Sequence, residues 1–240
     1  MPDKEGVLRD LVVGNRILAN ENILDAYGHI SVRNPENPEH YFLSCSRSPE
    51  LVQRNDIMEF RLDGTPIGGD KRTPYLERFI HGAVYERNPE TSAVVHSHAE
   101  EILPYTISSE SLIPVIHSAG IIGPVAPVWD IAEKFGDTTL LVINIEQGRD
   151  LAIELGTNRV VLMRGHGFAS AGRSISEVVR ISIMLARNAR VLTTALQFGH
   201  RVKALTAGEV TLRQKMRADG REFYRAWEYW ATRAGCSDML

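Results

Sequence analysis

The chain has 240 residues, of which 43% are hydrophobic and 24% charged, and its formal net charge is −3. This composition is typical of a folded globular protein; it excludes a disordered chain and the strong basic charge of a protein that binds nucleic-acid phosphates. We therefore expect no nucleic-acid partner and a single domain over residues 1–240.

Two features bear on the compartment. The two cysteines, Cys45 and Cys236, are far apart and neither has a CxxC or CxxH neighbour, which favours reduced thiols in a cytoplasmic protein. The first residues carry charge from position 3 and lack the apolar core of a signal peptide. No apolar run approaches the roughly 18 residues of a membrane span, so we expect a cytoplasmic protein with no membrane partner.

The first half of the chain alternates between helix and strand patterns. Apolar residues recur every three or four positions from about residue 5 to 22, which predicts an amphipathic helix. Short alternating runs at 25–34, 40–46 and 56–68 predict a small antiparallel set of strands. A second helix is predicted over 74–89, with Pro74 in its first turn and Asn88-Pro89 at its end. A strand is predicted over 92–100.

The second half continues the same pattern. Residues 139–145 are predicted to form a strand, and residues 158–172 a buried strand followed by an edge strand or hairpin partner. Helices are predicted from about Ser174 to Phe198 and from about 207 to 232. The aromatic residues between Tyr224 and Trp230 are best explained by packing in the core or an interface. These elements together predict an α/β domain with helices around a mostly antiparallel sheet.

His96 and His98 form the sharpest motif in the sequence. In a strand, residues i and i+2 point to the same face, with Cα atoms roughly 6.6 Å apart. Two imidazoles at this spacing can bind one divalent ion. A histidine pair satisfied by its surroundings is an equally good interpretation of this motif alone.

His166 and Glu77 are the candidates that would complete such a site. His166 lies between two glycines directly after a predicted strand, and catalytic metal sites usually have three protein ligands; alone, Gly-His-Gly is more often a turn. Glu77 near the start of a helix usually complements the helix dipole. Near a metal ion, however, it becomes a candidate general acid or base.

Together, these residues resemble the class II aldolase/adducin family. The motifs are Gly28-His29-Ile30-Ser31-Val32-Arg33, Glu77-Arg78-Phe79 with His81, His96-Ser97-His98 and Gly165-His166-Gly167, within a resemblance that covers about residues 6–200. The resemblance implies a three-layer α/β/α sandwich around a mostly antiparallel, mixed central sheet. It also implies a homotetramer or larger oligomer with sites at subunit interfaces, His96, His98 and His166 as metal ligands, and Glu77 as the acid/base.

The chain departs from the family's sugar-phosphate members where those bind phosphate. The family's Asn is replaced by His29, its Thr-Gly turn by Ser46-Arg47, and its Ser-Ser pair by Tyr75-Leu76. Arg47 offers a planar fork suited to a carboxylate, unless it is a solvated loop residue. His29 adds a neutral or cationic donor, and Tyr75 favours an aromatic ring over a polyol. We therefore expect His29, Ser46, Arg47 and Tyr75 to contact the substrate.

These departures resemble the branch of the family that decarboxylates hydroxy-aryl carboxylates, such as 3-hydroxy-2-methylpyridine-4,5-dicarboxylate. The resemblance implies a metal-dependent decarboxylase of a small carboxylate, with one divalent ion, Mn²⁺ favoured and Zn²⁺ the alternative. In this chemistry, Glu77 would deliver a proton to the ring carbon.

Several alternatives stay open. The chain could instead be a sugar-phosphate aldolase, epimerase or dehydratase of the same family, or a non-enzymatic adducin-like binding module. Either His117 or a C-terminal Tyr could be a second proton donor. The role of His81 stays open, and we interpret His40 and His200 as ordinary surface or packing residues.

Overall fold

The computed structural model describes residues 3–199, 201–215 and 220–240. Its centre is a seven-stranded sheet in the order β3-β2-β1-β4-β7-β6-β5. All neighbouring strands are antiparallel except β5 and β6, which are parallel. The strands are β1 (His29–Arg33), β2 (His40–Ser44), β3 (Ile57–Arg61), β4 (Ala93–Ser97), β5 (Val128–Trp129), β6 (Val160–Met163) and β7 (Gly167–Gly172).

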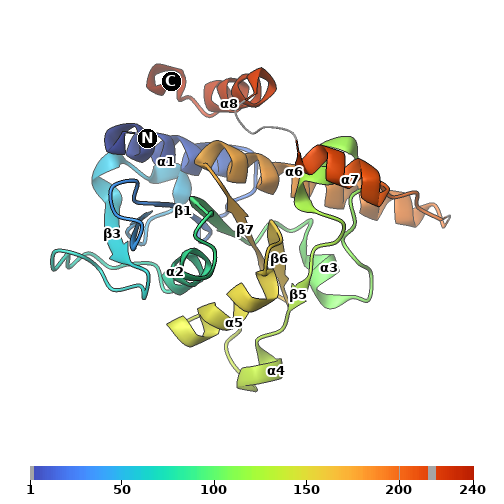
Figure 1. The fold of residues 1–240 in the computed structure, drawn as a ribbon, viewed down its shortest axis with the longest axis horizontal. Coiled ribbons are helices and arrows are strands. Elements are labelled where there is room, and N and C mark those ends of the chain that lie inside the picture. Colours follow the sequence, from blue (N-terminus) through green and yellow to red (C-terminus); the bar gives the residue numbers. More distant parts are fainter. Residues whose placement is uncertain (1–2, 200, 216–219) are drawn as a thin grey trace.

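Helices cover both faces of the sheet (Figure 1). On one face lie α1, α6 and α8, and on the other lie α2 and α5. Successive residues of a strand point to opposite faces, so Val95 packs with α1 and α6 while Val94 packs with α2 and α5. The predicted α/β sandwich around a mostly antiparallel, mixed sheet is thus confirmed. The helices are α1 (Lys4–Asn20), α2 (Arg78–Arg87), α3 (Leu103–Ile107), α4 (Ala132–Phe135), α5 (Ile145–Leu155), α6 (Ile175–Gln197), α7 (Ala207–Gln214) and α8 (Arg221–Arg233).

The register of the central strands prepares the functional site. His29 at the start of β1 pairs with His96 at the end of β4. His96 in turn pairs with Ala169 on β7, close to the turn that links β6 and β7. His29, His96 and the β6–β7 turn therefore lie at the same end of the sheet.

Two long helices agree closely with their sequence patterns. Helix α1 begins after Asp3, whose carboxylate accepts the N–H of Glu5. Helix α6 begins after Ser174, whose hydroxyl accepts the N–H of Glu177. Both are N-caps of the usual kind, and each marks the residue after which its helix begins.

Other predicted elements need correction. Helix α2 begins at Arg78 and not at Pro74, because Pro74 pairs in an isolated bridge with Cys45 and holds the chain extended. Residues 139–145 form no strand, since Leu140 adopts a left-handed backbone with φ 65° and α5 begins at Ile145. A short apolar run cannot by itself separate strand from helix, and α5 was missed for that reason.

The C-terminal region and the sheet edge also differ from the prediction. The single helix predicted over 207–232 is two helices, α7 and α8, with Gly220 as the N-cap of α8; residues 216–219 of that prediction lie outside the described residues. Strand β7 is the antiparallel hairpin partner of β6, as one of the two predicted alternatives has it, and not an edge strand. The edge is the short parallel β5, which the sequence did not predict. Short 3-10 segments cover Pro49–Leu51, Arg54–Asp56, His117–Ile122 and Ser237–Met239.

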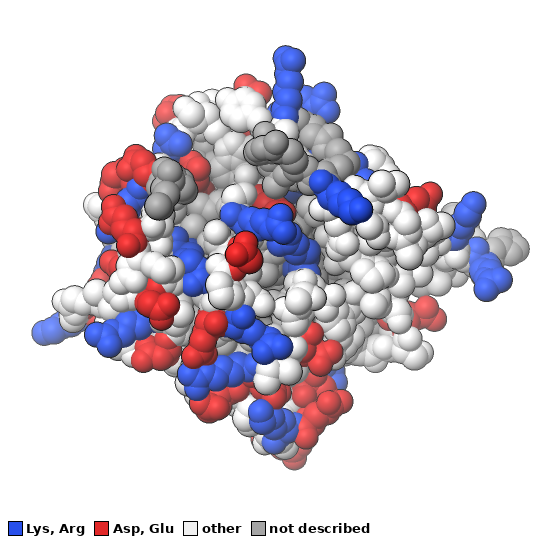
Figure 2. Space-filling model, in the orientation of Figure 1, with Lys and Arg blue, Asp and Glu red and all other residues white. Residues whose placement is uncertain are grey.

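The cysteines and the surface agree with the composition. Cys45 and Cys236 are free thiols. Figure 2 shows acidic and basic side chains interspersed over the visible face. Within the part of the chain that the structure describes, no helix combines the length and apolarity needed to cross a membrane.

Helices α2 and α5 approach each other closely at Gly148. A Cβ atom at this position would lie 2.5 Å from the carbonyl oxygen of Phe79, so any side chain would push the two helices apart. We expect Gly148→Ala to lower the free energy of unfolding by about 1–3 kcal/mol, as measured by urea denaturation.

The control is Gly208→Ala in α7. There the nearest atom to an added Cβ is the Thr206 hydroxyl oxygen at 3.8 Å, and alanine favours helix more than glycine does. This variant is expected to be as stable as the wild type or slightly more stable. Equal stability of both variants would contradict the close packing of α2 on α5.

Candidate metal centre and active site

Four side chains from three parts of the chain converge at one end of the sheet. His96 lies near the end of β4, His98 directly follows that strand, His166 lies in the β6–β7 turn, and Glu77 precedes α2. The Nε2 atom of His98 is 3.0 Å from Nε2 of His96 and 3.2 Å from Nε2 of His166. Glu77 Oε2 is 3.3 Å from His96 Nε2 and 3.4 Å from His166 Nε2. The structure therefore brings the three predicted ligands and the predicted acid/base together.

Each of the three imidazoles is anchored through its other ring nitrogen. In every case Nδ1 faces an oxygen that can only accept a hydrogen bond: Phe168 O at 3.1 Å from His96, the Asp25 carboxylate at 3.1 and 3.2 Å from His98, and Leu140 O at 2.9 Å from His166. A neutral imidazole that donates through Nδ1 carries its lone pair on Nε2. Three lone pairs and a carboxylate thus face one another, an arrangement that a cation would stabilise. This donor set fits a divalent metal ion.

The sequence analysis predicted none of these three anchors. Asp25 Oδ1 also accepts the N–H groups of Tyr27 and Gly28, at 2.9 and 2.7 Å. Burial opposes ionisation of Asp25, but these N–H groups and His98 hold its pKa below the usual value. An Asp shortly before a Gly is a turn signal that the sequence offered. Leu140 gave no such signal, since only its unusual backbone angle places its carbonyl against His166.

The charges of the site are set by burial and by Glu77. Burial raises the pKa of Glu77, but the adjacent His96 and His166 outweigh it and hold that pKa well below its usual range. Burial lowers the pKa of His166, yet the hydrogen bond and charge of Glu77 raise it overall. Burial and His96 lower the pKa of His98 to about 4. Near neutral pH, Glu77 is therefore ionised and His98 is neutral.

His29 and Tyr75 lie beside this cluster. The His29 ring centroid is 5.2 Å from that of His96 and 4.5 Å from that of Tyr75. Both side chains are buried, and the Tyr75 hydroxyl donates to the carbonyl oxygen of Arg47. Two of the four predicted substrate contacts therefore adjoin the predicted metal ligands.

The other two predicted contacts lie on the exposed loop after β2. Arg47 Nε donates to Leu51 O at 2.8 Å and lies 3.3 Å from Asp56 Oδ2. Ser46 is exposed, and its N–H donates to Thr73 O. Neither side chain contacts the histidine cluster among the described residues. His117 is exposed on the 3-10 segment His117–Ile122, and His200 lies outside the described residues.

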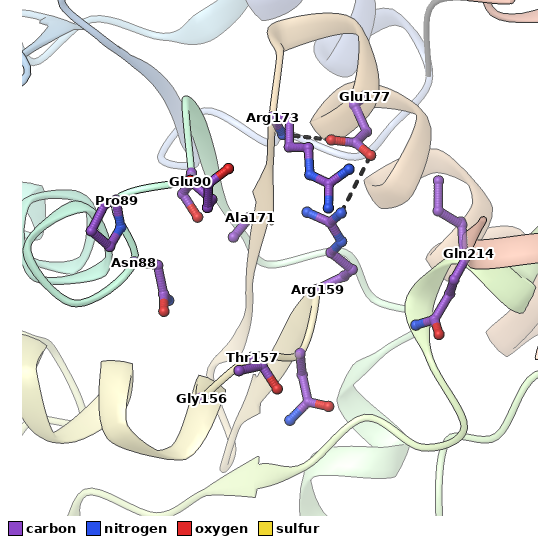
Figure 3. Close-up of a pocket in the computed structure, with 13 residues that line it drawn as sticks. Asn88, Pro89, Glu90, Gly156, Thr157, Arg159, Ala171, Arg173, Glu177 and Gln214 are labelled. Carbon is purple, nitrogen blue, oxygen red and sulfur yellow. Dashed lines mark hydrogen bonds and ion pairs between the residues drawn. The ribbon is translucent and has the colours of Figure 1, made fainter. Parts of the chain in front are cut away.

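A separate hollow of about 480 Å³ lies at the opposite end of the sheet (Figure 3). Its polar wall includes Arg159 and Arg173, which face the carboxylate of Glu177. Arg159 lies 3.6 Å from that carboxylate, and the backbone N–H of Arg173 donates to it. None of the predicted site residues lines this hollow. The candidate site is therefore the histidine cluster.

Comparisons with known proteins agree with this fold and identify the family. Residues 9–193 match the family described as Class II Aldolase and Adducin N-terminal domain. The decarboxylase tropJ of Talaromyces stipitatus is 38% identical over 202 residues, which cover 79% of this chain and 76% of the relative. The 3,4-dihydroxyphthalate decarboxylase of Arthrobacter keyseri is 27% identical over 184 residues, 72% of each chain. A solved aldolase II superfamily protein from Pseudomonas syringae superposes with a TM-score of 0.79 at 18% identity, covering 99% of this chain and 95% of that one; this likeness concerns the fold alone.

The buried His81 makes stability depend on pH. Burial lowers its pKa in the folded protein to about 3, whereas the unfolded chain titrates near 6.5. Below about pH 6.5 the unfolded state binds more protons, so this contribution is complete above that pH and is lost as the pH falls toward 3. We expect His81→Gln to flatten the fall of the unfolding free energy between about pH 6 and pH 4, by up to roughly 1.4 kcal/mol per pH unit.

The measurement is urea denaturation across this pH range with a chelator present, so that metal binding does not contribute. The exposed His117 supplies the control, since His117→Gln is expected to keep the wild-type slope. Equal slopes for His81→Gln and the wild type would contradict this account.

Proposed function

Because the chain belongs to the class II aldolase and adducin family, we propose that it is a divalent-metal-dependent decarboxylase of a hydroxy-aromatic or hydroxypyridine carboxylate. A substrate of this class is 3-hydroxy-2-methylpyridine-4,5-dicarboxylate. The observation that carries the proposal is the convergence of three imidazole Nε2 atoms and the Glu77 carboxylate at 3.0–3.4 Å.

The relatives support the reaction class. The family match confirms the resemblance found in the sequence, and the named decarboxylases confirm an enzyme of the carboxy-lyase type. The name of one relative specifies 3,4-dihydroxyphthalate, which is an aromatic dicarboxylate with one of its two hydroxyl groups next to a carboxylate. We extend this kind of substrate to the present chain.

We assign His96, His98 and His166 as the metal ligands, through Nε2. Imidazole ligands suit several divalent ions, and cellular availability often decides among them; we favour Mn²⁺, with Zn²⁺ as the alternative. When bound, the ion would supply Lewis-acid stabilisation of the negative charge that develops as CO₂ leaves.

We assign proton transfer to Glu77. Its Oε1 accepts the N–H of Val142 at 2.9 Å, which fixes the carboxylate beside the ligands. Since Glu77 is ionised in the free site, it must take up a proton after the substrate binds, and the substrate's own hydroxyl group is a sufficient source. Glu77 then delivers this proton to the ring carbon from which CO₂ has departed.

The remaining substrate contacts orient the ring. The Tyr75 ring beside His29 forms a flat wall for an aromatic substrate. Arg47 uses Nε for Leu51 and Asp56, but its two terminal nitrogens make no hydrogen bond among the described residues. We propose that these nitrogens, with His29 and the adjacent Ser46, hold the carboxylate that remains on the ring.

The proposal includes the setting of the site. We propose that residues 1–240 act as one domain of a cytoplasmic homotetramer or larger oligomer, with sites at subunit interfaces. The side chain of Tyr27, two residues before His29, is 75% exposed. Such an aromatic group beside the site is suited to burial against a second subunit.

The proposed reaction is tested by CO₂ release from the metal-loaded protein. We expect turnover of hydroxybenzoates, hydroxyphthalates or hydroxypyridine carboxylates that carry the hydroxyl next to a carboxylate, and none of their para isomers. Glu77→Gln is expected to lower kcat by at least about 100-fold, because it removes the proton donor and keeps the shape. Glu86→Gln is the matched control, since Glu86 lies on α2 but is exposed and paired with Arg149.

Failure of the metal-loaded protein to release CO₂ from any of these compounds, together with cleavage of a ketose phosphate, would overturn the proposal. It would establish the aldolase alternative. Equal activity of Glu77→Gln and Glu86→Gln would remove Glu77 from the chemistry.

The metal assignment predicts a graded series of affinities. Loss of a supporting hydrogen bond typically weakens metal binding by about 10–100-fold, which is the expectation for Asp25→Asn. His98→Ala removes a ligand and should weaken binding further. His40→Ala is the control, because His40 pairs with Glu59 away from the cluster. Metal content after dialysis and calorimetric titration with Mn²⁺ measure these effects, and unchanged binding by His98→Ala would contradict the assignment.

A further inference from the structure

A continuous hydrogen-bond chain runs from His29 into the protein interior. His29 Nδ1 lies 2.6 Å from His81 Nε2, His81 Nδ1 lies 2.6 Å from Ser31 Oγ, and Ser31 Oγ lies 2.7 Å from the Tyr85 hydroxyl oxygen. All four side chains are buried, none more than 2% exposed. His29 and Ser31 share one face of β1, and His81 and Tyr85 lie one turn apart on α2. The chain is thus built where this strand face meets this helix.

Two arrangements of the donated protons compete in this hydrogen-bond chain, one pointing toward His29 and one pointing toward Tyr85. Both ring nitrogens of His81 have a neighbour in the chain, so a neutral His81 must donate on one side and accept on the other. Burial lowers the pKa of His81 to about 3, so this ring is neutral near pH 7. The links can therefore all point toward His29 or all point toward Tyr85; a third order, in which Ser31 accepts from both neighbours, leaves the Ser31 hydrogen buried without an acceptor in this network and is disfavoured for that reason.

The Tyr85 end decides between the two orders. Burial raises the pKa of the Tyr85 phenol well above its usual value, so it keeps its proton. The backbone of Val94 also hydrogen-bonds the phenol and lowers its pKa, as a bond donated to the oxygen does, so Ser31 Oγ is the acceptor that the described residues offer to the phenol hydrogen. If the links pointed toward Tyr85, the phenol hydrogen would be buried without an acceptor, which disfavours that order by roughly 5- to 150-fold. The links therefore run from Tyr85 through Ser31 and His81 to His29.

We propose that Ser31 and His81 are positioning residues that lock His29 in the tautomer with its proton on Nε2. His29 then presents a hydrogen-bond donor to a carboxylate oxygen of the substrate, and it does not act as a base. The ring's Nε2 makes no hydrogen bond within the described residues and is not among their fully buried, unpartnered polar atoms, so its hydrogen can reach water or a substrate and is available for this contact. The role of the donor rests on the proposed function, whereas the tautomer itself does not.

The same geometry argues against a proton wire. The Arg33 guanidinium lies over the Tyr85 ring, 4.8 Å from its centroid, and covers the far end of the chain. A buried phenol with a raised pKa beside a cation has no route by which to exchange protons with solvent through this end. The hydrogen-bond chain therefore fixes the position of the His29 proton and does not conduct protons.

Nitrogen NMR of the Zn²⁺-loaded protein with ¹⁵N-labelled histidine tests the proposal directly. His29→Gln identifies the His29 signals by their loss. We expect Nε2 of His29 to carry the proton and Nδ1 to be unprotonated. A His29 ring with its proton on Nδ1 in the wild type would overturn the proposal.

Two variants separate a lock from simple packing. Ser31→Ala interrupts the hydrogen-bond chain, so both tautomers of His29 should appear in comparable amounts. Tyr85→Phe removes one link but leaves the Ser31 hydroxyl to donate to His81, so the wild-type tautomer should persist. Ser182→Ala is the matched control, because Ser182 is a buried serine bonded to Ser170 and Val178 away from the chain. The His29 nitrogen spectrum of Ser182→Ala should match that of the wild type. An unchanged His29 spectrum in Ser31→Ala would contradict the lock.

Kinetics supply the second readout. With about half of the protein in the competent tautomer, Ser31→Ala should raise KM about twofold with a smaller change in kcat. If the tautomer is found as expected but no hydroxy-aryl carboxylate is turned over, the proposed function fails and the lock stands. If turnover is found but His29 carries its proton on Nδ1, the lock fails and the proposed function stands.

Discussion

The central constraint in this protein is that three imidazoles must present lone pairs to one point without a proton between them. Each ring satisfies it by donating its Nδ1 proton to an oxygen that can only accept, on Phe168, Asp25 or Leu140. The Glu77 carboxylate adds negative charge to the same point. A cluster of this kind gains stability from a divalent cation, and the proposed decarboxylation depends on that cation being held beside a proton donor.

The strand register and helix α2 supply both parts of the site. The pairing of His29 with His96 places the proposed substrate contact next to one of the proposed metal ligands. Helix α2 contributes Glu77 at its start and then His81 and Tyr85 on one face, so the acid/base and the proposed lock depend on the same helix. Close packing of α5 against α2 at Gly148 holds this helix in place. Stability and chemistry are therefore coupled at this helix.

Much of this could be predicted from the sequence, and the remainder could not for physical reasons. The i and i+2 spacing of His96 and His98 predicted their shared face, and the apolar periodicity predicted helices α1 and α6. The anchors of the ligands depend on contacts between distant segments and on the left-handed backbone of Leu140, which no local pattern encodes. The hydrogen bonds of His81 to His29 and Ser31 depend on the packing of α2 against β1, which the sequence positions alone do not give.

The central claim is tested most directly by electron paramagnetic resonance of Mn²⁺ bound to protein with ¹⁵N-labelled histidine. The spectrum reports which nuclei lie in the coordination sphere, independently of any substrate. The account predicts hyperfine coupling to three imidazole nitrogens, one of which disappears in His166→Ala. A bound Mn²⁺ coupled only to water and carboxylate, with no histidine nitrogen, would contradict it.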